Sequence, residues 1–216
     1  MELPNKEHLW TWGMSLGLYS KPYWETGGTH ENTTQGDMIN LFKYHEDIAD
    51  AQRTRISNEF AREVFGLLAK ELRQKFPTST KLPFDVCVGL PENRGTGRSL
   101  PRNICRILAD EHEWLTDGFE GVIKTRTGEV IKEVPHDERP AKVEGLYAID
   151  KNKMPAPKFG FLVIDDVFET GSTVGGLCKT LEKEYPRVPR YIIALTHLHA
   201  TERMASEGCT RWLKTS

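Results

Sequence analysis

Two adjacent carboxylates and the hydroxyl-rich loop that follows them are the part of this chain best suited to chemistry. Asp165 and Asp166 come directly after the apolar run 161–164, which predicts a buried parallel strand that ends at the acidic pair. The loop Thr170-Gly171-Ser172-Thr173 then opens a predicted helix. Gly171 permits close backbone approach, and the loop hydroxyls and the first N–H groups of the helix can donate hydrogen bonds to phosphate oxygens. The stretch therefore predicts a phosphate site at the carboxyl end of a parallel sheet.

The acidic pair indicates a ligand that carries hydroxyl groups as well as a phosphate. Asp165 and Asp166 can accept hydrogen bonds from the two ribose hydroxyls while the loop holds a 5′-phosphate. The alternative is an acidic strand end followed by an ordinary turn and helix cap. A strand, an acidic pair, a tight loop and a helix start in immediate succession favour the ligand site.

The run 163–173 resembles the phosphoribosyl-diphosphate (PRPP) motif of type I phosphoribosyltransferases, which has two apolar residues, two acids, two apolar residues and a Thr/Gly phosphate loop. The resemblance implies an α/β fold with a central, mainly parallel sheet flanked by helices. It also implies Mg²⁺ and transfer of ribose 5-phosphate from PRPP to a nitrogenous base, giving a nucleoside monophosphate and pyrophosphate. The residues it assigns to the ribose and 5′-phosphate are Asp165, Asp166, Thr170, Gly171, Ser172 and Thr173, and Asp165 and Asp166 also hold Mg²⁺, partly through water.

Glu169 departs from the commonest form of this motif, in which Thr or Ser stands at its position. Relatives that use 6-oxopurines usually carry Asp there, which implies a purine-like acceptor and a catalytic role for Glu169 beside Asp165 and Asp166. A carboxylate next to the reacting ring nitrogen can take its proton or stabilise positive charge on the sugar. The alternative is a salt bridge between Glu169 and a neighbouring arginine.

A second strand–loop–helix unit is predicted upstream, with a strand over 84–90 and a helix over 99–112. By order along the chain, the resemblance makes its loop the pyrophosphate-binding one, with the residues Leu90, Pro91, Glu92, Asn93, Arg94 and Gly95. A short strand over 119–123 is followed by the polar stretch 124–139, between two expected core strands. In the family a mobile loop at this place brings a basic residue to the diphosphate, and Lys124 and Arg126 are the candidates. An exposed charged hairpin is the alternative.

Four short segments, 41–44, 98–103, 124–126 and 145–147, loosely resemble the ComF-like subgroup of phosphoribosyltransferase domains. The paired-cysteine zinc ribbon that often precedes such domains is missing from this sequence. Two other functions therefore stay open beside the enzyme. One is a non-catalytic protein that senses PRPP or nucleotides, and the other is a ComF-like accessory factor in DNA processing.

The resemblance divides the chain into an aromatic-rich extension over 1–45, packed on the core, and a phosphoribosyltransferase-like domain over 46–216. A long helix is predicted over 46–75 by apolar residues at three- and four-residue steps. The aromatic residues of the extension either pack against the core or cover a bound base. Family members are often homodimers, so a homodimer is expected here.

The composition is that of a globular protein, and the overall charge does not favour a nucleic-acid partner, which leaves only a local basic patch open. Of the 216 residues, 38% are hydrophobic and 28% charged, and the net charge is −2, which gives no global basic field. No apolar run approaches membrane-spanning length and the first residues lack a signal-peptide layout, so a cytoplasmic location is expected. The cysteines are scattered without a C-x-x-C pair and are expected to be reduced thiols: Cys87, Cys105, Cys178 and Cys209.

Overall fold

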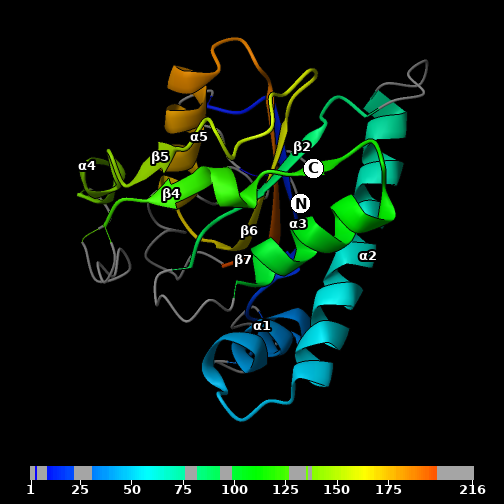
Figure 1. Cartoon of the computed structure of the whole chain (residues 1–216). Coiled ribbons are helices and arrows are strands. Elements are labelled where there is room, and N and C mark those ends of the chain that lie inside the picture. Colours follow the sequence, from blue (N-terminus) through cyan, green and yellow to red (C-terminus); the bar gives the residue numbers. More distant parts are fainter. Residues whose placement is uncertain are drawn as a thin grey trace.

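A five-stranded sheet, parallel throughout, forms the centre of the protein (Figure 1). The computed structural model describes residues 3, 9–21, 31–75, 82–92, 99–126, 135 and 138–198. The strand order is β1-β7-β6-β2-β3, and β4 and β5 form a separate antiparallel pair. The strands are β1 (Trp12–Leu18), β2 (Val86–Gly89), β3 (Thr116–Asp117), β4 (Val122–Lys124), β5 (Tyr147–Ile149), β6 (Phe161–Phe168) and β7 (Arg190–His197).

Helices cover both faces of this sheet, which confirms the predicted α/β class with a central parallel sheet. Figure 1 shows the sheet between α5 on one side and α2 and α3 on the other, with β4 and β5 on the α5 side. The helical elements are α1 (Thr34–Tyr44), α2 (Asp50–Lys75), α3 (Leu100–Glu111), the 3-10 turn η1 (Phe119–Gly121), α4 (Arg139–Val143) and α5 (Ser172–Glu184). Within the described part of the chain, no helix is long and apolar enough to cross a membrane.

The core consists of two hydrophobic clusters, one on each face of the sheet. Leu162 and Ile164 of β6 belong to the cluster that α2 and α3 cover. Phe161 and Val163 belong to the cluster under α5. This alternation is the two-residue period of a strand buried on both faces, and it explains why the sequence of β6 is apolar without interruption up to Asp165.

The chain folds in opposite directions from the neighbouring strands β2 and β6. From β2 it runs through α3 to β3 at one edge, and from β6 it runs through α5 to β7 on the other side. Because α3 and α5 lie on opposite faces, the carboxyl ends of β2 and β6 flank the switch point of the sheet. Ligands of open α/β sheets bind outside the strands at such a point. The two loops that the sequence predicts to bind the ligand, 90–95 after β2 and 170–173 after β6, both begin here.

Most predicted elements are present, with boundaries shifted by a few residues, but two expectations are wrong. Strand β6 does not end at the acidic pair, because Asp165 and Val167 still pair with Ala194 and Thr196 of β7. The segment 119–123 begins as the turn η1, and its strand β4 pairs with β5 outside the central sheet. The polar stretch after β4 therefore joins the strands of a hairpin, not two core strands.

The described part of the segment 1–45 contributes a strand to the central sheet. β1 pairs with β7 in parallel from Trp12 opposite Tyr191 to Leu18 opposite His197. Trp12 and Trp10 are buried in the two clusters, as expected for aromatic residues that pack on the core. The aromatic residues of 22–30 lie outside the described residues.

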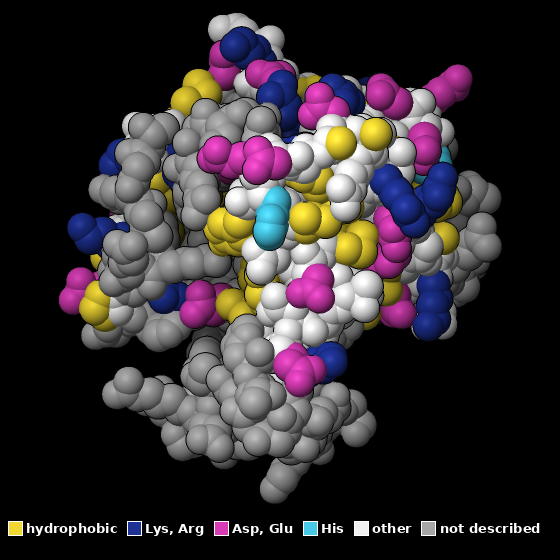
Figure 2. Space-filling model, turned by 90° about the horizontal axis from the view of Figure 1, so that it is seen from below, with side chains coloured by type: hydrophobic (Ala, Val, Ile, Leu, Met, Phe, Trp, Pro, Cys, Tyr) yellow, Lys and Arg dark blue, Asp and Glu magenta, His cyan; other side chains and the backbone are white. Residues whose placement is uncertain are grey.

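Charged side chains of both signs share the face of the protein at which α1 lies. Figure 2 shows this face, and in its described part Lys and Arg are interspersed with Asp and Glu around a central group of hydrophobic side chains. This distribution differs from the single basic surface that tracks a nucleic-acid backbone.

Candidate functional site

The two adjacent acids of β6 point to opposite faces of the sheet. The alternation of β6 up to Ile164 places Asp165 on the face covered by α5, and its Oδ1 accepts the N–H of Asp166 at 2.9 Å. Asp166 instead points toward α1, where its Oδ2 lies 2.6 Å from Nζ of Lys43. The structure therefore brings the acids to the expected edge of the sheet, but in different surroundings.

Lys43 and Asp166 form a largely buried ion pair, with 25% and 18% of their side chains exposed. Burial by itself lowers the pKa of Lys43, but the Asp166 carboxylate outweighs it, and the pKa of Lys43 is raised above its usual value. The loose resemblance to ComF-like domains included Lys43 in the segment 41–44 but assigned it no role. An isolated lysine in an amphipathic helix gives no signal of a partner 123 positions further along the chain.

Three contacts fix the position of the helix that carries Lys43. Thr33 caps α1 by accepting the N–H of Gly36 at 3.1 Å. Gly36 lies so close to the end of β1 that an added Cβ would be 2.0 Å from the carbonyl oxygen of Tyr19. At the other end, Nη2 of the buried Arg53 donates to the carbonyls of His45 at 2.9 Å and of Glu46 at 3.1 Å. Lys43 is thus presented by an anchored helix.

The loop after β6 passes through a left-handed glycine directly into helix α5. Gly171 adopts the left-handed conformation with φ of 78°, and an added Cβ would lie 2.7 Å from the ring of Phe168. Helix α5 follows at once, and its N-cap residue, Gly171, makes no side-chain capping hydrogen bond. Thr170 Oγ1 and Ser172 Oγ lie 2.9 Å apart. Ser172 and Thr173 belong to the first turn of α5, where the backbone N–H groups and the helix dipole favour an anion.

Glu169, which precedes this loop, makes the contact that the sequence left as the alternative to a catalytic role. Its Oε2 lies 3.1 Å from Nη1 of Arg139, the first residue of α4. The Arg139 side chain is only 7% exposed and that of Glu169 28%. The ion pair therefore holds Glu169 toward the segment between β4 and β5.

The described part of the upstream loop lies beside the acid-bearing strand. The N–H of Leu90 donates to the carbonyl of Ile164 at 2.9 Å, one residue before Asp165. Leu90 is buried, and Pro91 and Glu92 are half-buried. The remaining predicted pyrophosphate ligands, Asn93, Arg94 and Gly95, lie outside the described residues.

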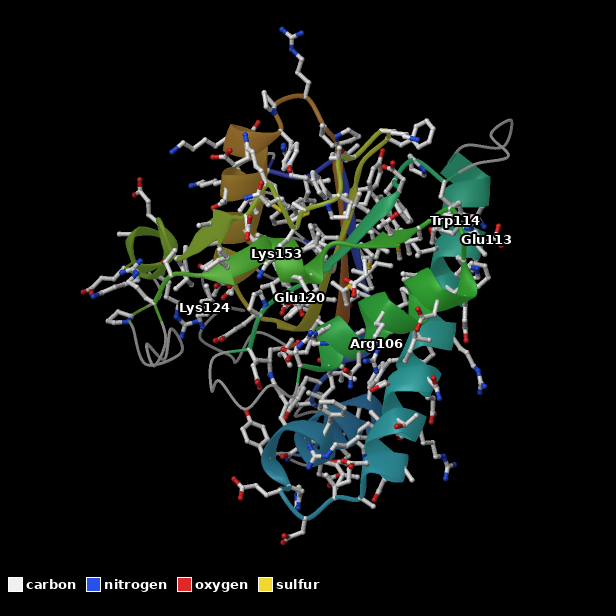
Figure 3. The ribbon with its side chains drawn as sticks, viewed as in Figure 1. Arg106, Glu113, Trp114, Glu120, Lys124 and Lys153 are labelled. Carbon is white, nitrogen blue, oxygen red and sulfur yellow. The ribbon has the colours of Figure 1, made fainter. Side chains whose placement is uncertain are left out.

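The two cations predicted to reach the diphosphate sit on the β4–β5 hairpin. Figure 3 shows Lys124 at the end of β4 that lies away from Trp114 and α2. Arg126 donates from Nη2 to the carbonyls of Lys142 at 2.9 Å and of Glu144 at 2.8 Å. These carbonyls close the short helix α4, so Arg126 braces the helix that presents Arg139.

Tyr147 is a candidate site residue that the sequence did not single out. It lies on β5 opposite Lys124, is 4% exposed, and its hydroxyl has no hydrogen-bond partner among the described residues. Burial, followed by the charges of Asp165 and Asp166, raises the pKa of Tyr147, so the hydroxyl stays protonated. A buried donor of this kind is normally satisfied, and the hydroxyl lies within electrostatic range of the acid pair, so it is a candidate to donate a hydrogen bond to a molecule bound there.

The donor set at the acid pair fits Mg²⁺ through water. Carboxylate oxygens are the ligands that this ion prefers, and it usually keeps several of its waters. Within the described ranges, no group of three or more His, Cys, Asp or Glu side chains forms a cage. Asp165 and Asp166 are the carboxylates at this edge of the sheet that could hold a hydrated ion, and Asp166 would do so while paired with Lys43.

Comparison with protein-family models and with curated protein sequences gives no match for this chain. The argument for a function therefore rests on the arrangement of the site residues. An acid-bearing strand, a helix start with glycine at its N-cap and the beginning of a second loop meet at the switch point of a parallel sheet.

Proposed function

We propose that this protein is a type I phosphoribosyltransferase that binds PRPP with Mg²⁺ and transfers ribose 5-phosphate to a nitrogenous base. The observation that carries the proposal is the juxtaposition of Asp165, the loop before α5 and the start of the loop after β2. Ribose hydroxyls need hydrogen-bond acceptors and a 5′-phosphate needs donors. The carboxylates of β6 and the N–H groups at the start of α5 supply them, and only a short loop separates the two. The all-parallel sheet flanked by helices is compatible with this fold.

In this proposal the N–H groups and hydroxyls of Thr170, Gly171, Ser172 and Thr173 bind the 5′-phosphate. Asp165 accepts a ribose hydroxyl on the α5 side, and Asp166, held by Lys43, completes the acidic pair. The pyrophosphate lies over the loop 90–95, with Lys124 or Arg126 offsetting its charge. Bound Mg²⁺ would offset negative charge on the diphosphate, and Asp165 would orient it through water.

Glu169 is the proposed contact to the acceptor base. Its carboxylate would take the proton from the attacking ring nitrogen or stabilise positive charge on the sugar, and Arg139 would orient it. A negative side chain in this place favours a purine-like ring that presents an N–H. Equal turnover by Glu169→Gln would remove Glu169 from the mechanism.

Titration calorimetry with PRPP at millimolar Mg²⁺ tests binding directly. We expect saturable binding by the wild type and none by the Asp165→Ala, Asp166→Ala double variant. Circular dichroism of the double variant at the titration temperature separates lost binding from lost folding. Absence of PRPP binding by the folded wild-type protein would contradict the proposal.

A screen of bases for pyrophosphate release then separates the enzyme from a sensor. Release with one base, dependent on both PRPP and the base, supports transfer and names the acceptor. Binding of PRPP without release by any base favours the non-catalytic sensor. Salt-sensitive binding of DNA in the absence of PRPP would favour an accessory factor in DNA processing, in which counterion release dominates affinity.

A further inference from the structure

Two cysteines that are 18 positions apart in the sequence meet inside the protein. Sγ of Cys87 and Sγ of Cys105 are 2.8 Å apart, and both side chains are fully buried. This separation is within about 1 Å of the S–S bond length of a disulfide, which is near 2.05 Å. The sequence predicted reduced thiols, and Cys87, Cys105 and Cys178 are free in the structure, the first two in contact with each other.

The contact follows from the packing of α3 on β2. Cys87 lies in β2 on the face that α3 covers, in the same cluster as Ile104 and Leu108 of α3. The approach of the two elements is close because Gly89 has no side chain, and a Cβ there would lie 2.6 Å from the carbonyl carbon of Pro101. The thiols therefore face each other across an interface that leaves little room to separate them.

We propose that Cys87 and Cys105 form an intramolecular disulfide when the protein meets a small peroxide. The Cys87 thiolate attacks one peroxide oxygen, the O–O bond breaks, and hydroxide leaves and takes the proton that the thiol released. The sulfur of Cys105 then attacks the sulfenic sulfur of Cys87, the S–S bond forms as the S–O bond breaks, and the hydroxyl group leaves with the Cys105 proton as water. In total, two thiols and one hydrogen peroxide give one disulfide and two waters.

Burial affects the rate of this reaction more than its direction. Burial and the contact with Cys87 raise the pKa of the Cys105 thiol, so Cys105 stays protonated until it resolves the sulfenic acid. Hydrogen peroxide is about the size of water and can reach a buried sulfur through local opening, whereas larger oxidants reach it more slowly. The same burial protects the disulfide from reduction once it has formed.

The disulfide would fasten the base of the β2–loop–α3 unit. Cys87 stands three residues before Leu90, and Ser99, which caps α3, contacts the Leu90 carbonyl at 3.4 Å. Closing a loop of this length restricts the unfolded chain and raises stability. The inference rests on the packing of these elements alone and holds whatever ligand the neighbouring loop binds.

Mass spectrometry of tryptic peptides after peroxide treatment tests the proposal. Cleavage gives the peptides 82–94 and 103–106, which carry Cys87 and Cys105 separately. We expect the native protein, treated with hydrogen peroxide, alkylated and digested, to give the two peptides joined, at two hydrogens below their summed mass. We also expect the oxidised protein to melt several degrees higher than the reduced protein.

Cys178 supplies a matched control, because it is also fully buried, lies in the other hydrophobic cluster, and has its pKa raised by burial to about 12. Cys178→Ser should leave the joined peptide unchanged, while Cys87→Ser and Cys105→Ser should each abolish it. Protein unfolded in urea should cross-link more slowly and without selectivity. Separately alkylated Cys87 and Cys105 in the treated native protein, or equal joining of either to Cys178, would overturn the proposal.

Discussion

Nζ of Lys43 and Oδ2 of Asp166 lie 2.6 Å apart, and this contact joins the first helix of the chain to the acid-bearing strand in the middle of the sheet. The lysine is held by a helix that Thr33 and Arg53 anchor at its two ends. The motif 163–173 is contiguous in the sequence, but the ion pair of its Asp166 depends on a segment more than a hundred residues earlier.

Removal of the Lys43 charge should destabilise the fold. Lys43→Met leaves Asp166 without its partner in a mostly buried place, and we expect a loss of about 1–3 kcal/mol in the free energy of unfolding. Lys43→Arg keeps the charge and should recover most of the loss. Urea unfolding of the three proteins at neutral pH measures this, and an unchanged midpoint in Lys43→Met would show that the pair contributes nothing.

The contribution of the pair should also disappear at alkaline pH. The pKa of Lys43 in the folded protein lies above its usual value of 10.5. The stabilisation is therefore fully present below pH 10.5 and is lost as pH rises through the higher folded-state value. The difference in unfolding free energy between wild type and Lys43→Met should shrink at the alkaline end of a series from pH 8 upward. A constant difference would contradict the assignment of the raised pKa to this pair.

Substitution of Asp165 should mainly weaken ligand binding, whereas substitution of Asp166 should mainly lower stability. Asp165→Asn keeps the oxygen that accepts the Asp166 N–H but removes the charge, so we expect PRPP affinity to fall at least tenfold and stability to fall less than in Asp166→Asn. Asp166→Asn should destabilise the protein, because it leaves the Lys43 ammonium unpaired, and adding Lys43→Met should recover part of the loss. Calorimetry and thermal melting of the same samples give both quantities. Equal effects of the two substitutions would show that the acids share one environment.

Removal of the Tyr147 hydroxyl should act in opposite directions on folding and binding. The hydroxyl is buried without a partner among the described residues, so Tyr147→Phe should keep or raise the melting temperature. If the hydroxyl donates to the ligand, PRPP affinity should fall about five- to twentyfold, as expected for one lost hydrogen bond. Tyr185→Phe, on the same face of the sheet and packed against Phe161, is the control. A lower melting temperature with unchanged affinity would place the partner of Tyr147 within the protein.

The Arg139–Glu169 pair should show energetic coupling that an exposed pair lacks. In a double-mutant cycle of Arg139→Met and Glu169→Gln we expect about 1–2 kcal/mol, because the arginine is 7% exposed. The control is Arg102–Glu120, whose side chains are 41% and 60% exposed and whose coupling should be about 0–1 kcal/mol. Equal coupling in the two cycles would mean that burial adds nothing to the Arg139–Glu169 pair.

Local sequence was sufficient for the order of the main elements and for the loop after β6. Apolar runs of four or five residues mark β2, β6 and β7 because both faces of these strands are buried. Gly171 marks the turn because the backbone there has positive φ beside the ring of Phe168. These features depend on neighbouring residues only.

Features of the site that depend on distant contacts were not predictable in this way. The divergence of Asp165 and Asp166 follows from the continued pairing of β6 with β7, which extends the strand past the expected end. The contacts Lys43–Asp166 and Cys87–Cys105 arise from packing between elements far apart along the chain, as does the burial of Tyr147, whose hydroxyl meets no partner in the described part of the chain. Neither periodicity nor residue type carries information about such partners.

The pairing of β1 with β7 covers an edge of the central sheet. β1 is the outermost of the described strands on its side, so a protein that begins at residue 46 would leave the β1 edge of β7 uncovered. β7 is eight residues long, and Ile192, Ile193 and Leu195 make it apolar on both faces. Long apolar edges of this kind recruit other strands, so we expect the shortened chain to aggregate rather than to survive as an independent domain.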